Sequence, residues 1–391
     1  MRRPSVPVLT TAVAMLAALL ALTPGRRVGQ TQGLDRAGIA RAVVARMALK
    51  PGEKVLFVGR PGVFDTLTAF LRQETRRAGG QDLGVYATGP GEPDDWHTPF
   101  TRGSRGASRA ELAEYLAGVD LAVMMPGAGT ADTAYAAMQD VLRTGRGRTI
   151  HFHWAGAYDL EGRLLRLTDR ISQVYQRAII ETDYLWLADI QRRFEQAMRG
   201  QPVRVTTPVG TDLTFEIGNR PVTRMDGDAS AARAAQARTL VDREIELPAG
   251  VIRVAPIEES VHGSIAFPPG WWGGIRVEGL VLRFERGRVS AVHAPTGRDA
   301  VAAELGPADG PGRAFREFAL GFNPLLAVPA DDPPWIPYYG YGAGVVRLSL
   351  GDNTELGGTV TGGYVRWNFF TDATVIVGTE VWVKDGELVQ R

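Results

Sequence analysis

Cysteine is absent from the 391-residue sequence. Its absence excludes disulfide bonds, thiolate metal ligands, a cysteine nucleophile and a lipid-modified cysteine near the N-terminus. Lysine is almost absent: it occurs only at Lys50, Lys54 and Lys384, and all other basic residues are arginines. The shortage of lysine is most simply a codon-composition bias, and we draw no function from it.

The chain also lacks an excess of charge of either sign. It carries 44 basic and 43 acidic residues, mixed along the sequence, for a net charge of +1. This balance gives no basic surface for nucleic acid or an anionic membrane, so we expect no nucleic-acid partner. With 45% hydrophobic and 22% charged residues, the chain can bury a large core and is long enough for two domains.

An apolar segment near the N-terminus predicts export. Arg2 and Arg3 precede an apolar run from Val8 to Leu22, after which the sequence turns polar. A charged start, a short apolar middle and a polar exit are typical of a secretory signal. The run is shorter than the roughly 20 residues of a membrane-spanning helix. We therefore predict a signal peptide over residues 1–32 and a periplasmic or extracellular protein, and favour this over an uncleaved membrane anchor.

Strand-like and helix-like segments alternate after the signal. The predicted strands are residues 54–58, 83–88, 120–125 and 148–154. Strands separated by helices pair in parallel and carry helices on both faces of the sheet. We therefore predict an α/β N-terminal domain over residues 33–200, which ends in a long helical connector from Leu164 to Met198.

Beyond residue 200 the pattern changes to short strands with frequent glycines and few helices. This pattern predicts an α+β C-terminal domain, rich in antiparallel strands, over residues 201–391. One segment departs from it, because residues 225–245 are rich in alanine and arginine. We interpret that segment as a surface helix or a mobile insertion.

Several motifs are spaced over nearly the whole chain after the signal. They are Lys50-Pro-Gly-Glu-Lys-Val-Leu56, Gly210-Thr-Asp-Leu213, Leu247-Pro-Ala-Gly250, Glu317-x-x-x-Gly-x-Asn-Pro324 and Leu350-Gly-Asp-Asn353. Their order and spacing resemble the thermophilic metalloprotease family of aminopeptidases, the leucyl aminopeptidase-like group of aminopeptidases T and S. The resemblance implies an α/β N-terminal domain, a C-terminal domain that holds two divalent metal ions, and a homodimer.

The positions at which that family binds its metal ions are largely altered in this chain. The resemblance places them at Val251, Glu317, Arg347, Arg366 and Asn368. Only Glu317 retains a ligand of the expected kind, where the family carries glutamates, histidines and an aspartate. Arginine offers no lone pair to a metal ion and repels it by its charge. We therefore expect the two-metal site to be lost and no metal cofactor to be bound.

Two interpretations of the altered site are open. If Arg347 and Arg366 converge on Glu317, their charges sum to about +1. Two divalent metal ions among three carboxylates also sum to about +1, so the net charge of the site would be preserved. Glu317 then either bridges both arginines in a structural ion-pair network, or the pocket stays open and the arginines bind an anionic group such as a carboxylate or phosphate. In both cases the chain is a non-catalytic homologue that binds a peptide, a small anionic ligand or a partner.

An alternative function is an active metal-dependent, leucyl-type aminopeptidase. It would require two metal ions, held through other residues such as Glu258, His262 and Asp352.

His151 and His153 lie on one face of a predicted strand, but no acid is placed beside them by the sequence, so packing is favoured over metal binding. The aromatic residues at 335–341 and at 271–272 are interpreted as core, cleft or interface.

Overall fold

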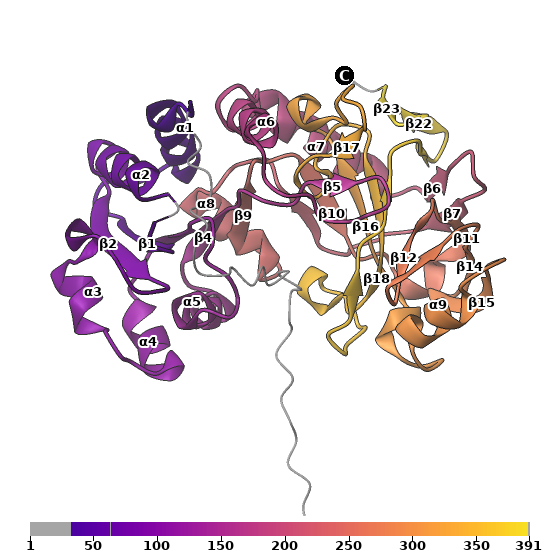
Figure 1. Cartoon of the computed structure of the whole chain (residues 1–391), viewed down its shortest axis with the longest axis horizontal. Helices are drawn as coiled ribbons and strands as arrows, with labels where there is room; N and C mark the ends of the chain where they lie inside the picture. The colour runs from indigo at the N-terminus through magenta and orange to yellow at the C-terminus, as the bar shows by residue number, and fades with distance from the viewer. Residues whose placement is uncertain (1–32, 63, 390–391) are drawn as a thin grey trace, which may run out of the picture.

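The computed structural model describes residues 33–62 and 64–389 (Figure 1). The predicted signal peptide, residues 1–32, lies outside the described residues. A parallel sheet with its helices forms one end of the molecule, and antiparallel sheets form the other end. The predicted combination of an α/β N-terminal part and a strand-rich C-terminal part is confirmed.

The parallel sheet has the strand order β2-β1-β3-β4-β9. Its strands are β1 (Lys54–Gly59), β2 (Gln81–Ala87), β3 (Leu121–Met124), β4 (Arg148–Phe152) and β9 (Glu244–Leu247). Its helices are α1 (Arg36–Met47), α2 (Asp65–Arg77), α3 (Pro99–Gly103), α4 (Arg109–Leu116) and α5 (Thr133–Arg143). Along β1, Val55 and Phe57 pack with α1 and α2, while Leu56 and Val58 pack with α4 and α5. Both faces of the sheet are therefore buried, as parallel sheets require.

The edge strand β9 comes from the part of the chain beyond residue 200. It pairs in parallel with β4, with Ile245 beside Ile150. The Ala- and Arg-rich segment thus differs from the surface helix or insertion that its composition predicts. Only the short helix α8 (Ala231–Ala234) and a 3-10 turn at Val241–Arg243 are helical there, and the segment ends in a strand whose apolar side chains are buried.

Within the predicted helical connector, residues 164–198, lie two helices, α6 (Asp169–Ile180) and α7 (Tyr184–Met198). Asp183 separates them, because its side chain accepts hydrogen bonds from the backbone amides of Leu185 and Trp186 and so caps α7. Phe194 on α7 packs against Trp382 at a ring-centre distance of 5.0 Å. Over the described residues, no helix has the length and apolarity needed to cross a membrane.

The second sheet is antiparallel, with the order β19-β18-β16-β10-β8, and β20 also pairs with β18. Its strands are β8 (Val222–Arg224), β10 (Val251–Val254), β16 (Phe315–Gly321), β18 (Val346–Gly351), β19 (Val365–Arg366) and β20 (Phe369–Phe370). Phe318 on one face packs against Phe215 of the third sheet, with ring centres 5.1 Å apart. That contact leaves the other face of the second sheet to form the site described below.

The third sheet is also antiparallel and has the order β15-β14-β11-β7-β6-β21-β22-β23. Its strands are β6 (Val203–Thr206), β7 (Asp212–Phe215), β11 (His262–Ala266), β14 (Val281–Glu285), β15 (Arg288–His293), β21 (Thr374–Val377), β22 (Glu380–Lys384) and β23 (Glu387–Leu388). Smaller elements are the hairpin of β12 (Gly270–Trp272) and β13 (Ile275–Val277), the pair of β5 (Tyr158–Asp159) and β17 (Trp335–Ile336), and helix α9 (Arg298–Leu305).

Gly344, just before β18, tests how tightly the C-terminal strands are packed. It has a φ of +84°, and a Cβ atom there would lie 1.8 Å from the carbonyl oxygen of Gly386. Gly363 has a similar φ of +75°, but a Cβ atom on that residue would have no other atom within 4 Å. We expect Gly344→Ala to lower the free energy of unfolding by more than about 3 kcal/mol, and Gly363→Ala by about 1 kcal/mol. Urea unfolding of the two variants measures the difference, and equal losses would contradict the close approach.

Candidate functional site: a buried arginine and glutamate network

The site lies on the face of the second sheet that is opposite Phe318. Strand register places Arg253 beside Ala319, and Ala319 beside Arg347. Because side chains two residues apart share a face, Glu317 lies on the same face as both arginines. The three central strands thus bring one carboxylate between two guanidinium groups.

Both carboxylate oxygens of Glu317 are occupied by arginines. Arg253 donates to Oε2 from Nε at 3.2 Å and from Nη2 at 2.9 Å. Arg347 donates to Oε1 from Nε at 2.9 Å, and its Nη2 lies 2.8 Å from the same oxygen. Ser349 donates to Oε1 at 3.3 Å. Each guanidinium group thus places two nitrogens near one carboxylate oxygen, and both nitrogens of Arg253 are hydrogen-bonded to it.

A second carboxylate, Glu355, completes the network. Its Oε1 accepts a hydrogen bond from Arg253 Nη2 at 2.8 Å and another from Arg316 Nη2. Arg316 Nε also lies 3.8 Å from Glu317 Oε2. The side chains of Glu317 and its arginine partners are at most 3% exposed. Three guanidinium groups thus meet two carboxylates, and the buried carboxylate of Glu246 adds a further negative charge near Arg253.

The network determines the protonation of Glu317. Burial alone would raise the pKa of this carboxyl group, but the charges of Arg253, Arg347 and Arg316 together outweigh burial and hold the pKa well below its usual range. Burial likewise opposes the charge on Arg253, yet Glu317 and Glu355 raise its pKa well above the usual value. Glu317 is therefore ionised and its lone pairs are directed to arginine.

Arg366 does not join this network. Its Nε donates to Asn368 Oδ1 at 3.0 Å, its Nη1 pairs with Glu304 at 2.5 Å, and its Nη2 donates to the carbonyl oxygen of Trp271 at 2.9 Å. Its guanidinium carbon lies 3.4 Å from the centre of the Trp272 ring. The expected convergence of Arg347 and Arg366 on Glu317 is thus only half present, because Arg347 converges and Arg366 does not.

The other positions from the sequence analysis have contacts of their own. Val251 is buried on β10, and Asn368 donates to the carbonyl oxygen of Leu348. Glu258 pairs with Arg220 and accepts from Asn353, whereas Asp352 accepts from the amides of Gly362 and Gly363. His262 is exposed. Among the described residues, no group of three or more histidine or acidic side chains is placed to hold a metal ion.

Sequence reasoning missed Arg253, Arg316 and Glu355. A signal for Arg253 was present, because it follows Val251 by two residues in a region of short predicted strands, and residues two apart in a strand share a face. Arg316 adjoins Glu317 but lies on a strand whose register shifts at this point. Glu355 belongs to a short 3-10 turn, and nothing in its sequence neighbourhood places it near Arg253.

The loop before β18 connects the network to the parallel sheet. Tyr339 accepts a hydrogen bond from Arg347 Nη1 at 3.0 Å through its carbonyl oxygen, and its amide donates to Gly156 at 2.7 Å. Tyr338 donates from its hydroxyl to the carbonyl oxygen of Leu247, at the end of β9, at 2.7 Å. Both tyrosines have positive φ, +37° and +54°. Such backbone costs about 1–3 kcal/mol per residue and persists only where many contacts hold it.

The two histidines of β4 share a face, as predicted, with ring centres 5.6 Å apart. His151 is buried, 3.2 Å from the Tyr135 hydroxyl through Nδ1 and 3.4 Å from Glu244 through Nε2. Hydroxyl, imidazole and carboxylate thus follow one another in the order used by nucleophilic enzymes. All three side chains are buried, so no substrate reaches them and the arrangement is structural.

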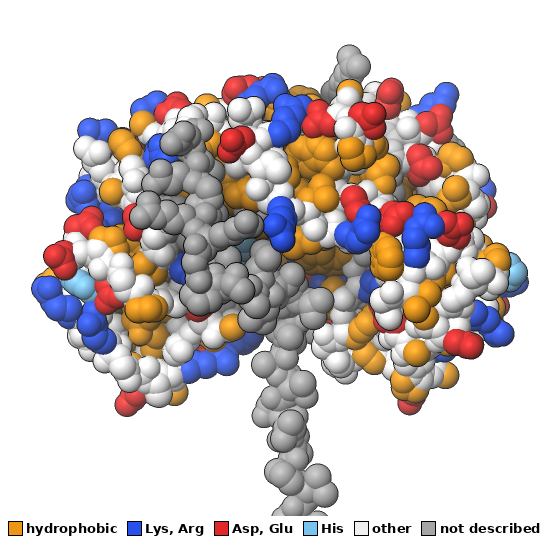
Figure 2. Space-filling view, in the orientation of Figure 1, with side chains coloured by type: hydrophobic (Ala, Val, Ile, Leu, Met, Phe, Trp, Pro, Cys, Tyr) orange, Lys and Arg blue, Asp and Glu red, His pale blue; other side chains and the backbone are white. Residues whose placement is uncertain are grey.

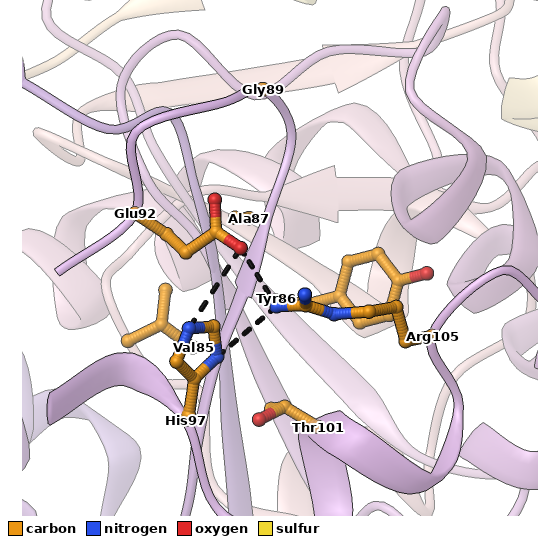
Figure 3. Close-up of a pocket in the computed structure, with 8 residues that line it drawn as sticks. All are labelled: Val85, Tyr86, Ala87, Gly89, Glu92, His97, Thr101 and Arg105. Atoms are coloured by element: carbon orange, nitrogen blue, oxygen red, sulfur yellow. Dashed lines mark hydrogen bonds and ion pairs between the residues drawn. The ribbon is translucent and has the colours of Figure 1, made fainter. Parts of the chain in front are cut away.

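A hollow at the end of β2 contains another charged group, which the sequence did not single out. Figure 3 shows Glu92, His97 and Arg105 directed toward one another. Arg105 donates to Glu92 at 2.7 Å, and His97 Nε2 lies 3.8 Å from the same carboxylate oxygen. Because these side chains satisfy one another, we assign no function to the hollow.

No protein-family model and no curated protein sequence matches the chain. Solved structures do match over 91% of its length. The chain is similar to 2,5-dihydroxypyridine dioxygenase from Pseudomonas putida KT2440, with a TM-score of 0.59 and 14% identity over 97% of that chain. It is also similar to AmpT from Thermus thermophilus, with a TM-score of 0.56 and 16% identity over 99% of that chain. The chain therefore has an aminopeptidase T-like fold.

Removing the charge of Glu317 tests the buried network. Glu317→Gln leaves three buried arginines with a single carboxylate, and we expect it to lower the free energy of unfolding by about 3–5 kcal/mol. Asp212 provides the matched control, since it receives two hydrogen bonds from Arg204 at 2.8 and 2.7 Å but is 54% exposed. Asp212→Asn should cost less than about 1 kcal/mol. Similar losses in the two variants, measured by urea unfolding, would contradict a buried network.

His153 gives a pH-dependent prediction. Burial, which outweighs the opposing charge of Glu246, lowers the pKa of His153 to about 4. The unfolded chain takes up this proton as the pH falls through about 6.5, whereas the folded protein does not until about pH 4. The contribution of neutral His153 to stability is thus fully present above pH 6.5 and is lost as the pH falls from about 6.5 to about 4. Between pH 7 and 4.5, His153→Gln should lose about 2 kcal/mol less than the unsubstituted protein.

The control for this experiment is His293→Gln, because His293 is exposed at the end of β15. Its loss of stability over the same pH range should match that of the unsubstituted protein. If the His153 variant also matches, the imidazole does not titrate differently in the folded and unfolded states.

Proposed function

We propose that the chain is an exported, non-catalytic protein with the aminopeptidase T-like fold, which binds a ligand or partner and does not hydrolyse peptides. One observation supports this most directly. Glu317, the remaining carboxylate at the family's metal positions, directs both oxygens to Arg253 and Arg347 at 2.9 Å. A metal ion at this carboxylate would have to displace two buried guanidinium groups.

The chemistry of the remaining residues agrees with this proposal. Hydrolysis by two metal ions needs carboxylates and imidazoles around a pair of cations about 3.5–4 Å apart. Here the corresponding positions carry a buried valine, two paired arginines and an asparagine whose amide is already hydrogen-bonded. The residues present do not fit a pair of metal ions, so we derive no metal-dependent step.

The fold does not decide the activity by itself. One similar structure carries the name of a dioxygenase and the other the name AmpT, so the architecture supports unlike chemistries. An active, metal-dependent aminopeptidase is the second candidate, and the likeness to AmpT is the observation that favours it. The two candidates differ in what they require of Glu317 and its neighbours.

The proposal extends to the ligand and the assembly. A peptide or another small ligand is the expected binding partner, in a homodimer and without nucleic acid. An anionic group on the ligand is not required by the charges, because Arg347 pairs with Glu317 and Arg366 pairs with Glu304. The pairing instead supports the structural interpretation of Arg347.

Metal content separates the two candidates. We expect the purified protein to carry less than about 0.1 equivalents of zinc, cobalt or manganese, since arginine repels cations from the altered positions. We also expect no chelator-sensitive cleavage of an aminoacyl chromogenic substrate. Elemental analysis and a hydrolysis assay on one preparation measure both. About two equivalents of metal together with chelator-sensitive cleavage would establish the aminopeptidase and end the non-catalytic proposal.

A double variant extends the same test. Arg347→His with Arg366→His supplies two imidazoles but no carboxylate at Val251 or Asn368, so activity should not appear in the presence of added metal. Recovery of metal-dependent cleavage would show that other acids, such as Glu258 or Asp352, already complete a metal site.

A further inference from the structure

Four large hydrophobic side chains are exposed on two segments that touch, the segment between β5 and α6 and the β12–β13 hairpin. Leu160, Leu164, Leu167 and Trp271 are each between 37% and 41% exposed. The segments meet where Trp271 Nε1 donates a hydrogen bond to Glu161 at 3.0 Å. Figure 2 shows hydrophobic side chains gathered on the face near β5 and β17, with charged side chains beside them. We call these four side chains the leucine surface.

The segment between β5 and α6 is held in place by its own hydrogen bonds. Asp159 accepts from the backbone amides of Glu161 and Arg163 at 3.0 and 2.8 Å. Leu165 packs against the core. Since neighbouring side chains of an extended chain point to opposite sides, Leu164 is directed to solvent. The exposure of the leucines is therefore part of the folded structure.

The leucine surface is large enough to be the centre of an interface. A large apolar side chain has about 200 Å² of surface, so the four together expose roughly 300 Å². Contiguous apolar patches of several hundred Å² on soluble proteins often bind a partner. A stable interface covers about 800 Å² on each partner and has an apolar centre with a polar rim.

Charged groups of both signs form the rim of the leucine surface. Arg276 pairs with Glu161 and with Glu278, and Arg163 pairs with Asp159. Arg163 also lies over the Trp271 ring, 5.4 Å from its centre. The rim thus consists of three arginines and three carboxylates: Arg163, Arg166, Arg276, Asp159, Glu161 and Glu278.

This balance of charge favours a second copy of the chain as the partner. A partner with charges of one sign would be repelled by half of the rim, whereas a second copy brings equal numbers of both signs. After a two-fold rotation, the arginines of one copy can face the carboxylates of the other, as a self-complementary interface requires.

A cavity of about 140 Å³ adjoins the leucine surface. Leu160 and Trp271 line it together with Arg366 and Asn368, two of the positions where the family binds metal. A second copy seated on the leucine surface would cover the cavity and provide part of its wall. Interfaces place their anchoring side chains in pockets of this kind.

We propose that a second copy of this chain docks on the leucine surface and its charged rim, in a two-fold symmetric dimer. The dimer closes the cavity beside Arg366, so two of the altered metal positions lie next to the interface between copies. This inference rests on the proposed function for the homodimer, and it assigns the surface that forms the dimer.

Sedimentation velocity of the full-length protein tests the dimer. At about 50 µM the unsubstituted protein should sediment as a dimer, because interfaces of standard size have dissociation constants in the micromolar range or tighter. Leu164→Glu with Leu167→Glu would place unpaired carboxylates in the interface, and should raise the dissociation constant at least about 100-fold.

Leu185→Glu is the matched control, because Leu185 is 86% exposed on α7 and lies outside the leucine surface. This variant should remain a dimer. A monomeric unsubstituted protein, or a dimer that the double variant leaves intact, would overturn the inference.

The absence of cysteine permits a second test, which locates the interface without adding charge. Leu164→Cys and Leu185→Cys each introduce a single thiol into the chain. At about 50 µM, a charged maleimide should label Leu164→Cys at least about 10-fold more slowly than Leu185→Cys, because the second copy covers the first thiol. In urea the two rates should be equal. Equal rates in the native proteins would overturn docking on the leucine surface even if the protein is a dimer.

Failure of this inference is distinguishable from failure of the proposed function. Metal content and aminoacyl hydrolysis are measured on the same preparation. Metal-free, inactive protein that is monomeric, or that dimerises elsewhere, overturns the assigned surface and leaves the non-catalytic assignment in place. Protein that carries metal and hydrolyses the substrate overturns the non-catalytic assignment, and sedimentation and labelling then decide the surface by themselves.

Discussion

The pairing of Glu317 with the guanidinium groups of Arg253 and Arg347 constrains the structure of the rest of the C-terminal part. Glu317 is ionised at the centre of the second sheet, where neither charge nor hydrogen bond can be supplied by water. Each partner depends on the others, since removing one member of a buried ion pair leaves an uncompensated charge. The positions of three strands and of the Glu355 turn are therefore tied to one another.

The same pairing links the two ends of the molecule. Arg347 holds the carbonyl oxygen of Tyr339, and this tyrosine and its neighbour Tyr338 reach the backbone of the parallel-sheet end. The left-handed backbone of both tyrosines is stable only because these contacts are made together. The network thus also orients the loop that contacts the parallel-sheet end.

The sequence predicts local and periodic features of this molecule well. Alternating helices and strands indicated the parallel sheet, and two-residue spacing placed His151 and His153 on one face. The sequence does not predict which distant segments contact one another. Glu355 reaches Arg253 only through a turn, and Arg366 turns to Glu304 because α9 packs beside the β12–β13 hairpin. Arg347 and Arg366 are both arginines, yet Arg347 pairs with Glu317 and Arg366 pairs with Glu304. Their positions in the sheet decide this difference, and residue type does not.

The course of the chain through β9 has a consequence for how this fold can be cut or exchanged. The chain leaves the parallel sheet after β4, enters the third sheet at β6, returns to the first sheet at β9 and leaves again. A fragment that stops at residue 200 would expose the open edge of β4, and a fragment that starts there would carry β9 without its partner. Neither end is formed by one continuous stretch of the sequence. Recombination with a relative therefore has to exchange both ends together or cut the chain at three places.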